Sequence, residues 1–278
     1  MSAMTISVLM SVYKSDVPEY LNKAIKSIWT DQTIKPNQIV LVEDGELSEE
    51  LLSVITKWKT ELGEILTILK NDENIGLTKS LNKGIKYVTS SLIARMDSDD
   101  ISVSTRFEKQ LDYLQTHPGI DIIGGSIREF NDENPNLRIR HYPETNEDVK
   151  KYIVKACPLA HPTVMMRRSI FDNGLCYNEK YRTSQDIALW YDALLKGHKI
   201  ANIPDITINF RSSGDMYKRR SRSKAWNEFK IYVGGIYRLK GLFTFNYIYP
   251  FARLIFRLIP HWGVKRIYGS KIRSKFLG

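Results

Sequence analysis

Apolar and polar residues follow two different periods along the first hundred positions, and these periods predict alternating strands and helices. Short apolar runs, many of them β-branched, are typical of strands buried in a parallel sheet; they occupy residues 5–12, 38–42, 65–69 and 92–94. Between them, apolar residues recur every three or four positions, which predicts helices around residues 21–29, 51–58 and 77–88. The alternation predicts an α/β fold in which helices cover both faces of a parallel sheet.

Beyond residue 100 the pattern loosens and predicts shorter, mixed elements. The expected elements are helices around 107–114, 149–156 and 186–195, strands at 163–168, 200–203 and 206–210, and a polar loop at 131–136. No internal repeat or low-complexity tract is visible. A chain of 278 residues is long enough to bury a substantial core in one large domain with an appendage.

Charge separates the chain into two parts. Residues 217–278 contain 15 Lys/Arg and a single acidic residue, Glu228, so this segment carries about +14 whereas residues 1–216 carry about −4. Aromatic and aliphatic residues alternate with these cations, as in helices that lie in an anionic membrane interface. A nucleic-acid surface has a similar composition, and so do ordinary helices whose basic face is solvated.

The cysteines and the apolar runs indicate the cellular compartment in which the protein is expected. Cys157 and Cys176 have no metal-type spacing, so we expect reduced thiols in a cytosolic protein. The apolar stretch at residues 6–12 lacks the basic flank of a signal peptide and is interpreted as a core strand. No run of about 18 apolar residues occurs, so no transmembrane helix is expected.

Polar side chains stand where the predicted strands end. Tyr13, Asp44, Asn74 and Asp97 each follow one of the first four strands, directly or in the loop beyond it. Ligands of open parallel sheets bind outside the carboxyl ends of the strands. These four side chains are therefore expected to share one crevice.

The cluster of Asp97, Asp99 and Asp100 is the strongest candidate for chemistry. Carboxylates this close repel one another, and a divalent cation relieves that repulsion. Aspartates two positions apart at the end of a strand can hold Mn²⁺ or Mg²⁺ together with a diphosphate. The alternative is an acidic turn in which Asp100 or Ser102 caps the next helix.

Several motifs in order carry a resemblance to a known family. They are a strand followed by Tyr13, the sequence Val-Glu-Asp-Gly at 42–45, Asn-x-Gly-Leu at 74–77, Met-Asp-Ser-Asp-Asp at 96–100 and Gln-Asp at 185–186. With these motifs the chain resembles family 2 glycosyltransferases of the GT-A fold, particularly bacterial enzymes that build O-antigen, capsule or exopolysaccharide. The resemblance covers about residues 4–212. It implies a GT-A catalytic domain over 1–212, with a nucleotide-binding half at about 1–100 and an acceptor-side half at about 101–212. A helical basic tail over 213–278 would follow.

The resemblance also implies roles for individual residues. Val12, Tyr13 and Asp44 would hold a uracil ring, since a carboxylate can accept the N3 proton that uracil has and cytosine lacks. Asn74 and Gly76 would belong to a loop that closes over the nucleotide. Lys79 would contact phosphate or base, or would simply lie on a solvated helix face.

Metal and base positions follow from the same resemblance. Asp99 would ligate the ion directly, Asp97 would contact the ribose or an ion-bound water, and Asp100 would bind the donor sugar or cap the following helix. Asp186 matches the general base of inverting relatives. An aspartate alone at this position would favour a helix N-cap, and the preceding motifs favour the base. Gln185 replaces a frequent glutamate.

Three further positions bear on the predicted site. His161 resembles a segment that borders the acceptor site in relatives, but a packed histidine is the simpler interpretation. Arg211 matches an arginine near the diphosphate. Many relatives have a histidine two positions later as a further metal or phosphate contact, and this chain has Ser213 instead.

We therefore expect a metal-dependent, inverting transferase. It would move a hexose or N-acetylhexosamine, with galactose or N-acetylgalactosamine slightly favoured, from a UDP-sugar to a saccharide linked to an undecaprenyl-diphosphate type of lipid. It would act in the cytoplasm on the inner face of the plasma membrane, bound peripherally through its basic tail, with no nucleic-acid partner. One competing interpretation is a nucleotidyltransferase, but this chain lacks the Gly-rich, basic signature that such an enzyme has after its first strand. The other is a non-catalytic scaffold that binds a membrane or nucleic acid. Sequence does not identify the donor sugar, the acceptor linkage or the oligomeric state.

Overall fold

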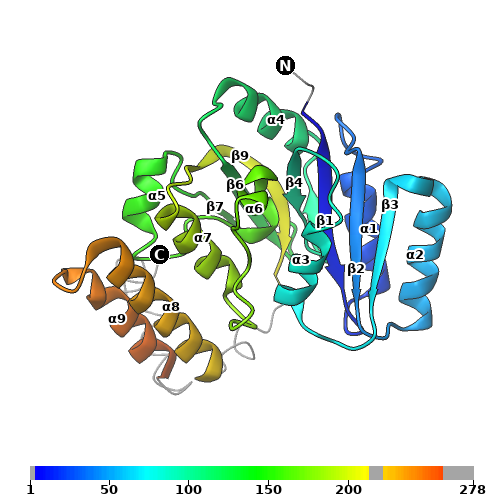
Figure 1. The fold of residues 1–278 in the computed structure, drawn as a ribbon. Helices are drawn as coiled ribbons and strands as arrows, with labels where there is room; N and C mark the ends of the chain where they lie inside the picture. Colours follow the sequence, from blue (N-terminus) through cyan, green and yellow to red (C-terminus); the bar gives the residue numbers. More distant parts are fainter. Residues whose placement is uncertain (1–3, 213–221, 259–278) are drawn as a thin grey trace.

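The computed structural model describes residues 4–212 and 222–258, and it confirms the strand–helix alternation of the first half. The elements there are β1 (Ile6–Val12), α1 (Pro18–Ile28), β2 (Gln38–Asp44), α2 (Glu49–Leu62), β3 (Leu66–Asn71), α3 (Leu77–Ile85) and β4 (Leu92–Arg95). Strands β1 to β4 pair in parallel in the order β3-β2-β1-β4. Their carboxyl ends consequently meet at one edge of the sheet (Figure 1).

The second half continues the same sheet with mixed directions. Its elements are β5 (Ile101–Ser102), α4 (Arg106–Thr116), β6 (Ile122–Phe130), β7 (Arg138–Arg140), α5 (Asn146–Tyr152), β8 (Met165–Arg167), α6 (Ser169–Asp172), α7 (Gln185–Leu195) and β9 (Ile200–Arg211). Strand β8 lies antiparallel between β4 and β6, and β6 pairs in parallel with β9. The strand order β3-β2-β1-β4-β8-β6-β9-β5 therefore joins both halves in one curled sheet.

Two boundary predictions were wrong. The strands expected at 200–203 and 206–210 are one strand, β9, in which Pro204 and Asp205 interrupt the pairing with β6 at an irregularity. Proline has no N–H to donate, so it interrupts the ladder without ending the strand. The helix expected at 149–156 is α5, which begins earlier because the Thr145 hydroxyl accepts from the Asp148 N–H, and which ends at Tyr152.

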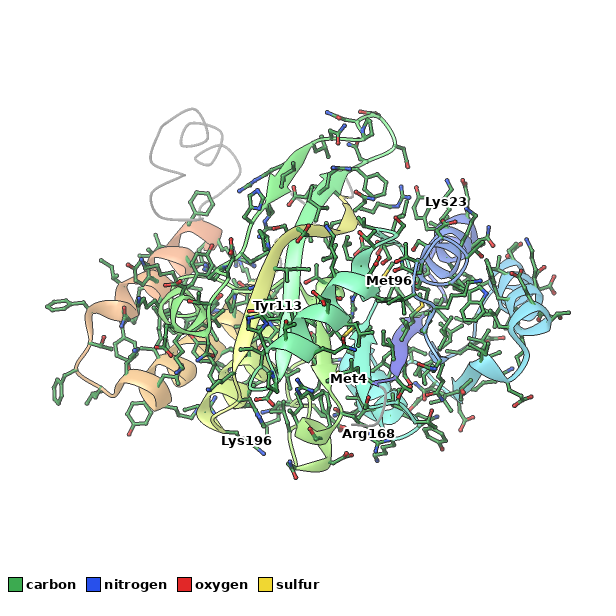
Figure 2. All side chains as sticks on the ribbon, turned by 90° about the horizontal axis from the view of Figure 1, so that it is seen from above. Met4, Lys23, Met96, Tyr113, Arg168 and Lys196 are labelled. Atoms are coloured by element: carbon green, nitrogen blue, oxygen red, sulfur yellow. The ribbon has the colours of Figure 1, made fainter. Side chains whose placement is uncertain are left out.

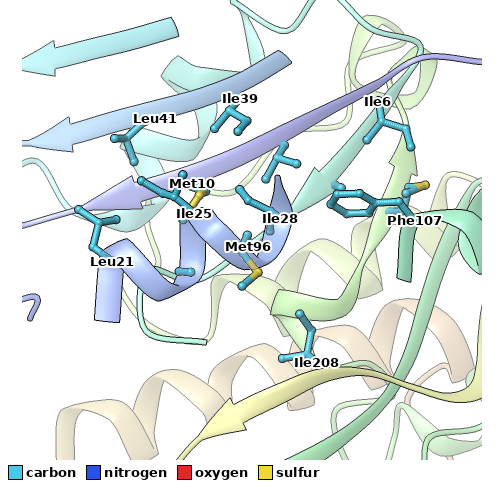
Figure 3. Packing of buried hydrophobic residues seen from close by; sticks show 14 of the residues in the cluster. Ile6, Met10, Leu21, Ile25, Ile28, Ile39, Leu41, Met96, Phe107 and Ile208 are labelled. Atoms are coloured by element: carbon cyan, nitrogen blue, oxygen red, sulfur yellow. The ribbon is translucent and has the colours of Figure 1, made fainter. Parts of the chain in front are cut away.

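Alternate residues of the central strands point to opposite faces of the sheet and enter two separate cores. On one face, residues such as Met10 and Leu41 pack against α1, α2 and α4 (Figure 3). On the other face, Leu9 and Val40 pack with α3 and with the layer that contains α7. Helices thus cover both faces, as the continuous apolar strands predicted.

Helices α8 (Arg222–Lys240) and α9 (Ile248–Leu258) form a hairpin at the end of the molecule opposite α2 (Figure 1). Ile231, Tyr232 and Ile236 of α8 are buried in the same core as α7. Residues 213–221 and 259–278, which hold Ser213 and much of the predicted basic tail, lie outside the described residues. Within residues 4–212 and 222–258, no helix combines the length and the apolar character that a bilayer crossing requires.

Candidate active site

A cleft of about 410 Å³ opens at the carboxyl ends of β1, β2 and β4. It brings together most of the predicted site residues, and its lining is Ser11, Tyr13, Asp16, Asp44, Asn74, Gly76, Leu77, Asp97, Ser98, Asp99, Phe210 and Arg211. The expectation that Tyr13, Asp44, Asn74 and Asp97 share one crevice is therefore confirmed. Tyr13 is 44% exposed and offers a ring face to a planar ligand.

Asp44 fixes the loop that follows β3. Its Oδ1 accepts from the N–H of Ile75 and its Oδ2 from the N–H of Gly76, both at 2.9 Å. Asn74 in turn donates its side-chain amide to the main-chain carbonyl of Asp44 at 3.2 Å. Gly45 has φ +87° and lies so close to this loop that an added Cβ would be 2.7 Å from the N of Asn74. The loop is thus held against the end of β2 by a buried carboxylate.

The aspartate cluster has the composition and spacing of a site for a divalent cation. One carboxylate oxygen from each of Asp97, Asp99 and Asp100 lies within 4.8 Å of the other two. Asp100 is fully buried; its Oδ1 accepts from the N–H of Arg211 at 2.8 Å, and its Oδ2 has no hydrogen-bond partner. Burial, and then the charges of Asp97 and Asp99, raise the pKa of Asp100 well above its usual value. A cation among these oxygens would offset the repulsion between the carboxylates and would give Oδ2 of Asp100 a partner.

The capping alternative for Asp100 and Ser102 does not hold. Helix α4 begins after Thr105, and no side chain caps it. Ser102 instead accepts a hydrogen bond from the Gln32 amide at 3.2 Å, and both side chains are buried.

Two buried arginines support the aspartate cluster from below. Arg95, the last residue of β4, forms an ion pair with Asp97, and its Nε and Nη1 have no hydrogen-bond partner. Arg106 of α4 donates from Nη2 to the carbonyl of Arg95 at 2.8 Å and from Nε to Gln110 at 3.1 Å. Desolvation lowers the pKa of Arg106 to about 9. The end of β4 is consequently fixed from the core side.

Asp16 lies two positions before α1, where an aspartate commonly caps a helix, but here it lines the cleft. Helix α1 has Val17 at its N-cap, and Asp16 accepts instead from the Tyr13 N–H at 3.1 Å and from the Ser98 hydroxyl at 2.9 Å. Burial raises the pKa of Asp16 to about 6, and the charges of Asp99 and Asp97 add to this. Asp16 therefore ties Tyr13 to the aspartate loop. Its separation of 82 positions from Ser98 left no signal in the sequence.

Arg211, at the end of β9, closes one side of the cleft. Its Nε donates to the carbonyl of Asp99 at 3.0 Å, and its Nη1 pairs with Asp132 at 2.6 Å. The guanidinium also stacks on Tyr20, 3.7 Å from the ring centre, and lies 4.6 Å from the ring centre of Phe130. A positive charge is thus fixed beside the aspartate cluster.

Asp186, the predicted base, lies on the first turn of α7 and does not line the cleft. Its Oδ2 is 3.7 Å from the Sγ of Cys157. Desolvation raises the pKa of Asp186, while hydrogen bonds from backbone N–H groups and the charge of Arg95 lower it. The helix N-cap position belongs to Ser184, so Asp186 is not the cap. Arg95, the ion-pair partner of Asp97, thus also lowers the pKa of Asp186 through its charge.

A model of the family described as Glycosyl transferase family 2 matches residues 7–175. The chain belongs to this family. Among curated relatives, the glycosyltransferase is 35% identical to the amylovoran biosynthesis glycosyltransferase AmsE of Erwinia amylovora, over 91% of this chain and 94% of that protein. It is 31% identical to the UDP-Gal:alpha-D-GlcNAc-diphosphoundecaprenol beta-1,3-galactosyltransferase of Escherichia coli, over 96% of each chain.

Solved structures place the glycosyltransferase in the GT-A fold. TarS of S. aureus superposes with a TM-score of 0.66 at 17% identity, covering 98% of this chain and 47% of that one, so this chain spans about half of TarS. The mannosyltransferase PcManGT of Pyrobaculum calidifontis, solved with GDP-Man and Mn²⁺, superposes with a TM-score of 0.65 at 12% identity, covering 99% of this chain and 76% of that one. At these identities the likeness concerns the fold.

Besides Asp100 and Asp186, three predicted positions of the glycosyltransferase lie outside the lining of the cleft. Val12 is fully buried in the core beneath Tyr13. Lys79 lines a neighbouring pocket of about 270 Å³ that shares Asn74 and Gly76 with the cleft. His161 is packed, as the simpler interpretation had it: its Nε2 lies 2.8 Å from the Tyr177 hydroxyl, and desolvation lowers its pKa well below the usual value.

Proposed function

We propose that the protein is an inverting glycosyltransferase that moves a hexose or N-acetylhexosamine from a UDP-sugar to a lipid-linked saccharide during bacterial surface polysaccharide synthesis. The observation that carries the proposal is the single cleft in which Tyr13, Asp44 and the aspartates Asp97 and Asp99 meet. Such a cleft offers a ring face and a hydrogen-bond acceptor to the base of a nucleoside diphosphate, and a cation site to its phosphates.

The nucleotide would lie along the ends of β1 and β2. Tyr13 stacks on the uracil, and Asp44 accepts its N3 proton while holding the loop of Asn74 and Gly76 against the ring. Val12 contributes from the core by supporting Tyr13. Lys79 reaches the nucleotide from the adjoining pocket.

Asp99 and Asp97 would hold Mn²⁺ or Mg²⁺, with Asp100 completing the acidic cluster. When bound, the ion supplies Lewis-acid stabilisation of the charge on the departing diphosphate. Arg211 adds fixed positive charge on the same side, since its Nε is bonded to the carbonyl of Asp99. Asp100 also positions the donor sugar through the backbone it holds at Arg211.

Asp186 would act as the general base. It takes the proton of the acceptor hydroxyl as that oxygen forms a bond to the anomeric carbon. The bond between the anomeric carbon and the diphosphate oxygen breaks on the opposite face, and its electron pair leaves with UDP. Attack opposite the leaving group inverts the anomeric centre.

The acceptor and donor are proposed from the relatives and from the surface of the hairpin. The related Escherichia coli enzyme is named for a diphosphoundecaprenol-linked acceptor and for UDP-Gal, which supports a lipid-linked acceptor and slightly favours galactose or N-acetylgalactosamine. TarS is solved with UDP-GlcNAc. Exposed apolar side chains on α8, α9 and their connection fit peripheral binding to the inner face of the plasma membrane, in the cytoplasm.

The test is release of UDP, GDP, dTDP or CMP from a panel of nucleotide sugars, with Mn²⁺ or with EDTA. Wild type should turn over one UDP-sugar only with the metal, and Asp99→Ala should lose at least about 10²-fold. Asp112→Ala, which removes an exposed aspartate of α4, is the matched control and should match wild type. If calorimetry detects no binding of UDP with Mn²⁺, the transferase proposal fails and a scaffold role takes its place.

A further inference from the structure

The residue that begins the base-carrying helix has an unusual backbone conformation. Ser184 has φ 61°, and within the described residues it is the one non-glycine residue with a positive φ. It is the N-cap of α7, two positions before Asp186, yet its hydroxyl does not cap its own helix. The hydroxyl instead donates to Oε1 of Glu228 on α8 at 3.2 Å. A neighbour outside the catalytic sheet therefore holds this strained position.

Glu228 is placed where a carboxylate is costly. It is 5% exposed, and it is the single acidic residue among the 62 residues from 217 to 278. Its Oε2 pairs with Nη2 of Arg257 on α9 at 2.8 Å. A buried carboxylate needs such partners to offset its desolvation, so Glu228 connects both helices of the hairpin to the start of α7.

The packing of α8 on α7 fixes this contact in register. The rings of Tyr191 and Tyr232 meet edge to face with centroids 6.0 Å apart. Gly235 approaches Tyr191 so closely that an added Cβ would be 2.4 Å from the ring. At the far end of the contact, Arg238 pairs with Asp192 at 2.7 Å, but this pair is half exposed and contributes little to the packing. Helix α8 therefore lies along α7 in one arrangement.

We propose that Glu228 is a positioning residue for Asp186, acting through Ser184, so that the C-terminal hairpin completes the acceptor-activating part of the active site. The inference rests on the proposed role of Asp186 as base. It gives the hairpin a second role besides membrane attachment, because the same two helices set the angle at which α7 presents its first turn.

The charges around Asp186 provide a readout that a purely structural contact would not move. In the described part of the chain, four groups face Asp186. They are Arg95 from β4, Cys157 from the loop after α5, Tyr177 from the segment between α6 and α7, and Glu228 from α8. The charge of Glu228 raises the pKa of Asp186 and that of Arg95 lowers it. Neutralising Glu228 removes a charge that raises the pKa of Asp186. The acidic limb of the pH profile of kcat should therefore move to lower pH.

The test compares Glu228→Gln, Ser184→Ala and their double variant with wild type, measuring kcat, KM for the UDP-sugar and the pH profile of kcat. We expect kcat to fall about tenfold in each single variant with KM nearly unchanged, because the donor cleft is untouched. The double variant should be no slower than either single one. Glu228→Gln should also show the acidic limb at lower pH. Arg238→Ala breaks a contact between the same two helices away from Ser184 and should keep the wild-type kcat.

Ser184→Gly is a second variant that accepts the positive φ and lacks the hydroxyl, and it tests the contact if Glu228→Gln fails to fold. Wild-type kcat and pH profile in Glu228→Gln, or additive losses in the double variant, would overturn the proposal. Failure of the base assignment is separate, because Asp186→Ala would then stay active in the same assay. An inactive Asp186→Ala together with a fully active Glu228→Gln rejects only the positioning role.

Discussion

The main-chain N–H of Arg211 donates a 2.8 Å hydrogen bond to Oδ1 of Asp100, across 111 positions of sequence. This bond joins the end of β9 to the loop that carries the aspartate cluster. Because Oδ1 is occupied, Oδ2 is the oxygen of Asp100 without a hydrogen-bond partner. Strand β9 thus determines which oxygen of Asp100 is available to a cation.

Replacing Asp100 with asparagine should separate stability from cation binding. Asparagine keeps an oxygen for the Arg211 N–H and removes a buried charge that Asp97 and Asp99 repel, so the midpoint of thermal unfolding should rise without metal. Affinity for UDP in the presence of Mn²⁺ should fall by about tenfold or more. Calorimetry with and without Mn²⁺ measures the second effect. Unchanged metal-dependent affinity would show that Asp100 serves only the fold.

The pH dependence of turnover should report Asp186. Its pKa is raised by desolvation, and the base is active only when deprotonated, so kcat should rise with pH through a pKa above the usual 3.8 and then level off. Asp186→Asn should lose at least about 10²-fold in kcat and the acidic limb with it.

The raised pKa of Asp186 also predicts that Asp186→Asn does not lose stability, although it loses activity. A carboxyl whose folded pKa exceeds its unfolded pKa contributes stability below the unfolded pKa and loses it as pH rises through the folded pKa. Asp186→Asn should therefore unfold at the same or higher urea concentration than wild type at pH 8, which excludes misfolding as the cause of inactivity. Asp192→Asn, six positions along α7, is the control for kcat and should keep the acidic limb.

The sequence predicted the parallel half of the sheet and most of the cleft, and there are physical reasons for both. Strands buried on both faces are continuous apolar runs, and side chains after their carboxyl ends must meet at one edge. Tyr13, Asp44, Asn74 and Asp97 were found in this way, without information on distant contacts.

The remaining site residues depend on contacts that no local pattern records. Asp16 looks like a helix cap until its bond to Ser98 is seen, and Arg95 looks solvated until β8 and α4 enclose it. The contact of Glu228 with Ser184 spans 44 positions and two helices. The division at residue 212 stays a prediction, although α8 shares a core with α7.

Two glycines allow the close packing of the loop after β3 against the end of β2 to be tested with a matched control. Gly63→Ala places a methyl group in open space at φ +54° and should cost about 1 kcal/mol through backbone strain alone. Gly45→Ala combines φ +87° with a contact of 2.7 Å to Asn74, and should cost roughly 2 to 4 kcal/mol. Urea unfolding measures both, and affinity for UDP should fall only in Gly45→Ala. Equal losses of UDP affinity in both variants would show that the packing of Gly45 against this loop does not matter for UDP binding.

Membrane attachment should depend on the connection between α8 and α9. Phe243 and Phe245 are 97% and 98% exposed in this connection. The hairpin of α8 and α9 lies at the end of the molecule opposite α2 (Figures 1 and 2). Aromatic rings at a bilayer interface and cations at its headgroups act together, so binding to anionic liposomes should weaken with salt and fall about tenfold or more in the Phe243→Ser/Phe245→Ser double variant.

Leu52→Ser, which removes an exposed apolar side chain from α2, is the control for liposome binding and should sediment with the liposomes as wild type does. Turnover of the donor with a water-soluble acceptor should be unchanged in the double variant, because Phe243 and Phe245 are almost fully exposed and lie outside α7 and α8. Transfer to a lipid-linked acceptor in liposomes should fall with binding. If the double variant binds liposomes normally, or if the wild type binds RNA at submicromolar concentration and ignores anionic liposomes, the basic hairpin serves a different partner.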